Sequence, residues 1–278
     1  MAVTRYVVFS SNQVQSYEFM APIAAMCWMA RTEFKPVCLL TQTREHWDVP
    51  TGRVVVDMLE RLEVQRHYVG PITEPYRTSV QAQASRQHAA AHKIFQPDDY
   101  IMTMDVDALP INGAWFSNVD WSKPCHIRNS TAWQHRWYTT FGFGATVAAW
   151  RSFMGYGPTG DIGALLQKNL DLDLTKERDT MSEWFFDEFL WCSRLKVSSL
   201  WPDGCQFIAR NVSTDRVDRG CWPDVIGDIG GFIDAHVLRP SHKREHWHMV
   251  RALLTKLLSA NQLEVVDQYH KRYVEAAS

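Results

Sequence analysis

The chain has 278 residues, of which 46% are hydrophobic and 22% charged, a balance that is typical of a globular protein and gives no reason to expect disorder. Its 29 lysines and arginines nearly cancel its 31 acidic residues, which excludes the basic surface of a nucleic-acid-binding protein. No stretch reaches the roughly 18 apolar residues of a membrane span, and the N-terminal apolar run is too short for a signal peptide, so we expect a soluble intracellular protein.

The first part of the chain alternates between strand and helix patterns. Strands are expected at short β-branched or apolar runs, namely Arg5–Ser10, Pro36–Leu40, Val64–Val69 and Tyr100–Met104. Helices are expected between them, at about Tyr17–Arg31, Arg53–Leu62 and Ser79–Phe95. This order predicts an α/β fold, with a mostly parallel sheet flanked by helices on both faces. In such sheets ligands bind beyond the carboxyl ends of the strands.

Further along the chain the pattern is less regular. After an aromatic, turn-rich stretch, Phe141–Val147 is expected to form a glycine-bearing strand. Thr180 and Glu183 have capping-box spacing, which predicts that a helix begins there and runs to about Leu195. The remaining elements are expected at Phe232–His236 for a last strand and at about His242–Leu258 and Val265–Ala276 for two helices.

Two aspartates follow directly on an expected strand, in the order Asp105, Val106, Asp107. We expect Pro110 to prevent that strand from continuing. Where the chain turns at a strand end, both carboxylates can converge on one cation. Carboxylates suit Mg²⁺ or Mn²⁺, which take their remaining ligands from water and phosphate oxygens. The alternative is that Asp105 caps a turn and Asp107 is solvated, but the buried strand before the pair favours a metal site.

A second acidic pair lies within an aromatic helical run. Asp187 stands three residues after Trp184 and four residues before Trp191, so its carboxylate shares a helix face with two indoles. Burial there raises a carboxyl pKa, as a general base near neutral pH requires. We therefore predict that Asp187, with Glu188 beside it, is catalytic. The alternative is an amphipathic helix whose solvated acids favour the helix dipole.

The order of strand, D-x-D, glycine-bearing strand, acidic aromatic helix and late histidine resembles that of the GT-A glycosyltransferases, and most closely the branch that includes glycogenin and the lipopolysaccharide galactosyltransferases. The resemblance implies one Rossmann-like domain over residues 1–278. About 1–110 would bind a nucleotide-sugar, about 111–240 would form a smaller, mixed acceptor-side half, and 241–278 would form C-terminal helices. It implies transfer of sugar from a nucleotide-sugar, expected to be a UDP-sugar, to a hydroxyl group of a glycan or other acceptor.

The same resemblance assigns the metal ligands. Asp105, Asp107 and His236 would hold Mn²⁺ or Mg²⁺, and imidazole suits the Mn²⁺ type of site. Lys243 would contact the diphosphate, although this chain lacks the family's glycine and Lys-Pro-Trp ending after the histidine. The alternative for His236 is a histidine that merely finishes a buried strand.

Four further positions are expected to bind the donor. Ser11 follows the first strand, and Val106 lies between the two aspartates. Arg86 resembles the family's basic residue on the helix before the D-x-D strand, with an exposed helix arginine as the alternative. Gly144 lies in Phe141–Phe153, which resembles the family's strand that starts beside the donor sugar and ends in a tryptophan-arginine pair. Its glycines let backbone approach a ligand, or they mark a bulge.

Three other functions are compatible with single features. Residues 242–246 spell H-x-x-E-H, a zinc metallopeptidase signature, with Glu264 and Glu275 as the acids available for a third ligand. A haloacid-dehalogenase-like phosphatase also has D-x-D after an apolar strand, but it requires Thr or Val where Ala108 stands. A non-catalytic carbohydrate-binding protein would use the 12 tryptophans and need no metal. We rank all three below glycosyl transfer.

Overall fold

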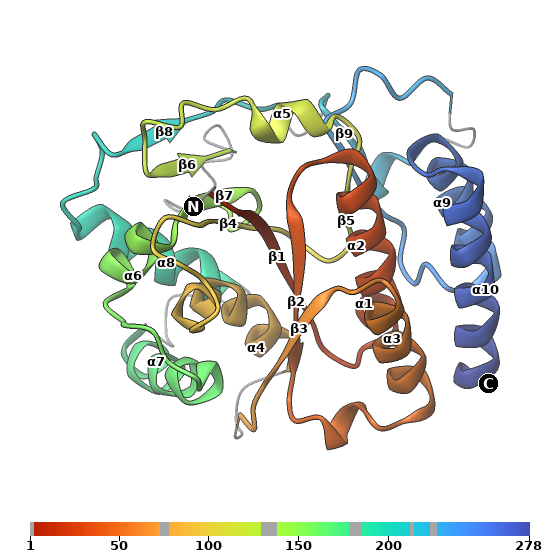
Figure 1. Ribbon diagram of the computed structural model, residues 1–278, viewed down its shortest axis with the longest axis horizontal. Coiled ribbons are helices and arrows are strands. Elements are labelled where there is room, and N and C mark those ends of the chain that lie inside the picture. Colours follow the sequence, from red (N-terminus) through yellow and green to blue (C-terminus); the bar gives the residue numbers. More distant parts are fainter. Residues whose placement is uncertain (1–2, 73–77, 129–137, 178–184, 212–213, 223–226) are drawn as a thin grey trace.

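The computed structural model describes residues 3–72, 78–128, 138–177, 185–211, 214–222 and 227–278, and Figure 1 shows their arrangement. The strands are β1 (Arg5–Ser11), β2 (Lys35–Thr41), β3 (Gln65–Val69), β4 (Tyr100–Thr103), β5 (Ala108–Pro110), β6 (Cys125–Ile127), β7 (Phe143–Thr146), β8 (Cys205–Phe207), β9 (Arg216–Asp218) and β10 (Asp234–His236). The helices are α1 (Gln15–Glu18), α2 (Met20–Arg31), α3 (Pro50–Arg61), α4 (Thr78–Ser85), the 3₁₀ helix η2 (Arg86–Ala91), α5 (Gly113–Ser117), α6 (Val147–Met154), α7 (Ile162–Glu177), α8 (Phe186–Val197), α9 (Arg244–Leu257) and α10 (Ala260–Ala277).

In the described part of the chain, the larger sheet has seven strands in the order β3-β2-β1-β4-β7-β6-β8. Its first four strands in this order are parallel, and β7 runs antiparallel to both of its neighbours. The predicted α/β fold with a mostly parallel sheet is confirmed. Because ligands bind beyond the carboxyl ends of such strands, the end of β4 is the first place to look for a site.

Helices cover both faces of this sheet, as the alternation predicts (Figure 1). Along β1 successive side chains point to opposite faces, so Val7 and Phe9 join one apolar core and Val8 joins the other. The first core is shared with α2, α3, α9 and α10, and the second with α4, α6, α7 and α8. Among the described helices none combines the length and the apolar character that crossing a membrane requires.

A second sheet of three strands, in the order β5-β10-β9, lies next to the end of β4. Its register places His236 opposite Ala108 on one side and opposite Asp218 on the other. The backbone N–H of Val237 also donates to the carbonyl of Asp107 at 3.0 Å. This small sheet therefore brings His236, near the end of the chain, beside the D-x-D segment.

Two expectations about the strands around the D-x-D segment need correction. The strand before the D-x-D pair does stop, at Thr103, but Pro110 is not the reason, because it ends β5, an edge strand of the second sheet where its missing N–H is tolerated. The glycine-bearing strand expected over Phe141–Val147 is present as β7, but the longer strand that the family resemblance implied over Phe141–Phe153 is not. β7 ends at Thr146, whose hydroxyl accepts from the N–H of Ala149 and so caps α6. The tryptophan-arginine pair that follows therefore lies on a helix.

Several helix boundaries also differ from their patterns. The helix expected over Ser79–Phe95 ends as α4 at Ser85 and continues as η2 to Ala91. The last helix begins at Ala260, earlier than expected, because the side chains of Ser259 and Gln262 form a capping box there. The predicted cap formed by Thr180 and Glu183 lies outside the described residues.

Candidate functional site

Three potential metal ligands converge at the carboxyl end of β4. Asp105 and Asp107 come from the turn that follows the strand, and His236 comes from the end of β10. One ligand atom from each lies within 4.8 Å of the others, and they form a three-residue group of this kind within the described ranges. Two carboxylates and an imidazole suit Mn²⁺ or Mg²⁺ with further ligands from water or phosphate. The donor set therefore fits the cation that the D-x-D pattern predicts.

The two ring nitrogens of His236 face different carboxylates, those of Asp107 and Asp218. Its Nδ1 lies 3.4 Å from Oδ2 of Asp218, and its Nε2 lies 3.4 Å from Oδ2 of Asp107. A metal-binding histidine commonly uses one ring nitrogen for the cation and the other for a carboxylate. Sequence analysis missed Asp218, because only the pairing of the short strand β9 with β10 brings it to the site.

Asp107 is buried among cations. Its Oδ2 accepts a 2.9 Å bond from Nη1 of Arg219 and lies 3.3 Å from Nε of Arg239. Burial raises the pKa of this carboxyl, but His236, Arg239 and Arg219 outweigh burial and leave the pKa well below its usual range. The carboxylate is therefore ionised at neutral pH, as a metal ligand must be.

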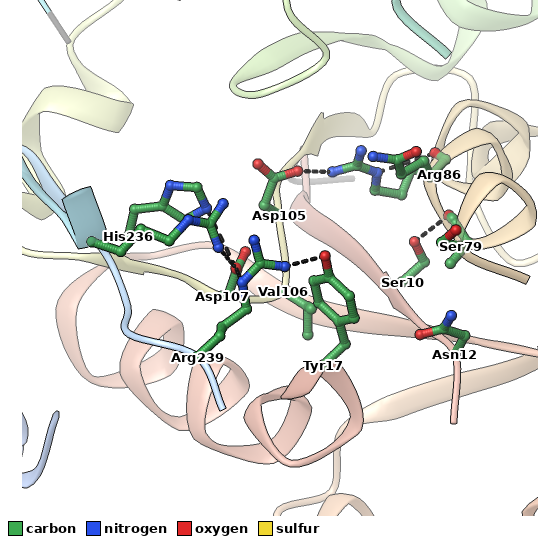
Figure 2. A pocket seen from close by; sticks show the side chains of 13 residues that line it. Ser10, Asn12, Tyr17, Ser79, Arg86, Asp105, Val106, Asp107, His236 and Arg239 are labelled. Atoms are coloured by element: carbon green, nitrogen blue, oxygen red, sulfur yellow. Dashed lines mark hydrogen bonds and ion pairs between the residues drawn. The ribbon is translucent and has the colours of Figure 1, made fainter. Parts of the chain in front are cut away.

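Asp105 faces a different arginine. Nη1 of Arg86 lies 2.5 Å from Oδ1 of Asp105 and donates to the carbonyl of Met104 at 2.9 Å, while Nη2 donates to Oδ2 of Asp187 at 3.1 Å. In Figure 2 Asp105 points toward Arg86, whereas Asp107 points toward His236 and Arg239. Arg86 is buried, so the alternative of an exposed helix arginine is wrong.

The acidic pair on α8 has raised pKa values. Burial raises the pKa of Asp187, and the charge of Arg86 offsets part of that effect. Burial, followed by the charges of Asp187 and Asp105, raises the pKa of Glu188 to about 8. Trp191 is buried against Phe143, with ring centroids 4.1 Å apart, whereas Trp184 lies outside the described residues.

A pocket opens over the D-x-D segment. It is lined by Ser10, Asn12, Tyr17, Ser79, Ala82, Gln83, Arg86, Asp105, Val106, Asp107, Arg219, His236 and Arg239. Five of the residues predicted at the metal or donor site line this one pocket, namely Arg86, Asp105, Val106, Asp107 and His236. Asp187 reaches this pocket through its hydrogen bond to Arg86 and is not itself part of the lining.

Two expected donor-binding residues lie elsewhere. Ser11 is buried, with its hydroxyl donating to the carbonyl of Asn12, and its neighbours in sequence, Ser10 and Asn12, line the pocket instead. Alternation along β1 explains why Ser10 lines the pocket and Ser11 does not, since it turns successive side chains to opposite faces. Lys243 is exposed at the start of α9 and does not line the pocket, whereas Arg239 does.

Gly144 has a packing reason for lacking a side chain. It pairs with Met102 and His126 in the sheet, and a Cβ there would lie 2.0 Å from Oη of Tyr100. No atom of Gly144 is part of the pocket lining. The pairing of β7 is regular at this glycine, so it marks no bulge, and it allows a close approach between β7 and the tyrosine ring of β4.

The H-x-x-E-H segment does not form a zinc site in the structure. His242 lies before α9, where its ring packs against Phe19 and Tyr273, while His246 is in the first turn and approaches the carbonyl of Pro240. The two histidines therefore do not share one helix face. The convergent group found in the described residues is the one at the end of β4.

The sheet order, the small second sheet and the D-x-D segment between them define the GT-A fold of glycosyltransferases. The galactosyltransferase LgtC, solved in complex with donor and acceptor sugar analogs, matches with a TM-score of 0.51 and 12% identity, over 91% of this chain and 96% of that chain. The glycosyltransferase GlyE of Streptococcus pneumoniae TIGR4 matches with a TM-score of 0.50 and 12% identity, over 98% of this chain.

The chain spans 64% of the length of that GlyE chain. Neither a protein-family model nor a curated protein matches the sequence. At 12% identity the likeness to LgtC and GlyE shows a shared fold. What the chain does must therefore be argued from its own residues.

Proposed function

We propose that this protein transfers a sugar from a nucleotide-sugar donor, expected to be a UDP-sugar, to a hydroxyl group of a glycan or other acceptor. One observation supports this most strongly: Asp105, Asp107 and His236 converge inside a pocket at the carboxyl end of β4. A cation held there, Mn²⁺ or Mg²⁺, would neutralise the charge that grows on the departing nucleoside diphosphate.

The chain's own residues would act around that cation. Asp105, Asp107 and His236 would hold it, with Asp218 fixing the orientation of the histidine ring. Residues from about the first 110 supply most of the pocket and would bind the donor, while Arg219, His236 and Arg239 complete it from the second part. About 111–240 would otherwise face the acceptor, and 241–278 form the C-terminal helices.

The acids on α8 would act at the sugar and the acceptor. Arg86 holds Asp187 beside Asp105, so an ionised Asp187 would favour positive charge developing at the anomeric carbon. Glu188, with a pKa of about 8, binds a proton more strongly than an ordinary carboxylate. It would therefore take up the proton of the acceptor hydroxyl as the new glycosidic bond forms.

Thermal-shift measurements with a panel of nucleotide sugars, each with and without Mn²⁺, test this proposal. We expect a UDP-sugar to raise the melting temperature only when the metal is present, because the cation bridges the aspartates to the diphosphate. Asp107→Ala should abolish that shift, whereas Asp98→Ala, at an exposed aspartate outside the pocket, should preserve it. A metal-dependent shift that survives Asp107→Ala unchanged would show that the metal assignment is wrong.

Measuring sugar transfer as well as the thermal shift distinguishes the role of the metal site from that of the acids on α8. Asp187→Ala should retain the metal-dependent thermal shift and lose sugar transfer, because Asp187 is not part of the pocket lining and reaches it only through Arg86. Release of UDP from the donor in the absence of acceptor would also exclude a purely carbohydrate-binding role. Loss of the thermal shift in folded Asp187→Ala would contradict the division of roles.

A further inference from the structure

Two arginines of the pocket lining contact the buried carboxylate of Asp107, which lines the same pocket. The Asp107 side chain is 3% exposed, whereas the side chains of Arg219 and Arg239 are 30% and 25% exposed. Both arginines approach the same oxygen, Oδ2, which is also the oxygen nearest to His236. Figure 2 shows Arg239 between Asp107 and Tyr17, to whose hydroxyl it donates a hydrogen bond.

These guanidinium groups compete with a cation for that oxygen. A metal ion bound by Asp107 and His236 would lie within a few ångströms of two positive charges, in a partly buried site where repulsion is poorly screened. The pocket lining already carries three arginines against two aspartates, and so one net positive charge. A divalent cation alone would raise this excess to three charges. Metal binding by itself is therefore disfavoured.

A bound diphosphate would offset the repulsion between the cation and the two arginines. Its negative oxygens offset the added charge of the cation, and guanidinium groups bind phosphate oxygens in a bidentate manner. Both arginines are exposed enough to reach a ligand in the pocket, and the guanidinium carbon of Arg239 lies 4.7 Å from the ring centroid of Tyr17 at the pocket wall. Arg219 and Arg239 can thus exchange Asp107 for a diphosphate while a metal takes their place.

We propose that Arg219 and Arg239 couple metal binding to diphosphate binding: without nucleotide they pair with Asp107 and oppose the cation, and with nucleotide they turn to the phosphates and release Asp107 to it. This inference rests on the proposed function, since it assigns a role to two arginines of the same donor site. By thermodynamic linkage, the nucleotide then increases metal affinity by the same factor as the metal increases nucleotide affinity.

The alternative is that the arginines only support a buried carboxylate. Their removal would then leave Asp107 poorly held, and Mn²⁺ affinity in the absence of nucleotide would fall. The coupling role predicts the opposite sign, because removing a competing positive charge frees the ligand oxygen. The direction of this one change separates the two roles.

The experiment is a titration of Mn²⁺, followed by the electron paramagnetic resonance signal of the free ion, without and with saturating UDP. We expect Arg219→Gln and Arg239→Gln to bind Mn²⁺ alone about threefold to tenfold more tightly than the wild type. With Mn²⁺ saturating, UDP should bind about tenfold more weakly to both variants, so that the coupling factor falls. Inorganic pyrophosphate should reproduce these effects if the diphosphate is what the arginines bind.

Two further variants serve as controls. Arg239→Lys keeps a positive charge and should retain part of the coupling, although lysine cannot bind phosphate in the bidentate manner. Arg244→Gln removes an exposed arginine at the start of α9, outside the pocket lining, and should leave both affinities unchanged. Melting temperatures of all variants establish that each is folded before its affinities are compared.

The outcomes distinguish this inference from the proposed function. If the wild type binds Mn²⁺ and UDP and either glutamine variant binds Mn²⁺ alone less tightly or equally, the arginines are structural and the inference is wrong. If both variants retain the full coupling factor, it is also wrong. If the wild-type protein binds neither UDP nor pyrophosphate at any Mn²⁺ concentration, the proposed function fails and the inference fails with it.

Discussion

Arg86 and Asp187 form a buried ion pair, with Nη2 of the arginine 3.1 Å from Oδ2 of the aspartate and both side chains at most 5% exposed. The same guanidinium group lies 2.5 Å from Asp105 at the end of β4. One arginine from the start of η2 therefore ties the acidic helix α8 to the metal-binding turn. This link fixes the distance between the two groups of carboxylates on which the proposed reaction depends.

Breaking this ion pair should strongly destabilise the protein. Arg86→Gln leaves the buried charge of Asp187 uncompensated, and we expect a loss of about 3–5 kcal/mol in the free energy of unfolding, measured by urea denaturation. The double variant with Asp187→Asn should recover part of the loss, because the buried carboxylate that lost its partner is then neutral. Arg53→Gln, which removes an exposed partner of Asp48, should cost less than about 1 kcal/mol. Equal losses in both single arginine variants would contradict this account.

A substitution at Gly144 tests whether packing or donor binding requires the glycine. A Cβ there would lie 2.0 Å from Oη of Tyr100, and that hydroxyl group is held at 3.0 Å by both Arg128 and His126. Gly144→Ala should therefore cost about 1–3 kcal/mol in chemical denaturation. Gly157→Ala, where the new methyl group meets no atom within 4 Å, should stay within about 0.5 kcal/mol of the wild type.

The affinity for nucleotide tests the other possibility, that Gly144 contacts the donor. Because Gly144 does not line the pocket, the folded fraction of Gly144→Ala should bind UDP with Mn²⁺ as tightly as the wild type. Calorimetric titration at a temperature well below the melting point measures this affinity. A variant of normal stability with weakened UDP binding would instead place the glycine at the donor.

The parallel strands and the D-x-D turn could be predicted because their signals are local. A central parallel strand is buried on both faces and appears as a continuous apolar run, as in Tyr100–Thr103, which is buried throughout. The chain must leave the sheet at its carboxyl end, so polar residues that follow at once, here Asp105 and Asp107, lie where ligands bind.

The rest of the site depends on pairing between distant segments. β5 and β9 have three residues each, too few to show a period, and they exist because β10 lies between them. Asp218 and Arg219 reach the metal site only through this pairing, so no local pattern indicates them. Ser10 lines the pocket and Ser11 does not, and the sequence could not distinguish them, since a short strand does not reveal which face each side chain will meet.

Asp218 gives a test of how His236 is oriented. Asp218→Asn removes the negative charge 3.4 Å from Nδ1 while keeping the shape of the side chain. We expect Mn²⁺ affinity in the presence of UDP to fall about tenfold to a hundredfold, because carboxylates that orient a ligating histidine contribute that much. Asp228→Asn, at an exposed aspartate outside the pocket lining, is the matched control. Unchanged Mn²⁺ affinity in Asp218→Asn would show that His236 needs no such partner.

The raised pKa of Glu188 predicts how stability depends on pH. Burial raises this pKa to about 8 in the folded chain, from an ordinary value of about 4.5. A carboxyl group that binds its proton more tightly when folded stabilises the protein fully below about pH 4.5, and this contribution is lost as the pH rises through about 8. Glu188→Gln carries a neutral side chain at every pH, so the contribution of this position to the stability of the variant does not change with pH.

Melting temperatures of the wild type and of Glu188→Gln, measured from pH 5 to pH 9, should therefore diverge. Near pH 5 the two proteins should melt within about 1–2 °C of each other. By pH 9 the variant should melt several degrees higher, because it avoids the cost of burying a charged Glu188. Each kcal/mol of that cost corresponds to about 2–4 °C in melting temperature. Histidines with lowered pKa values, such as His88 and His126, lose stability in the opposite direction, as the pH falls. Both proteins share them, so they cancel in the difference. Parallel curves over this range would show that Glu188 is ionised without cost, and the proton-accepting role proposed for it would then lose its physical basis.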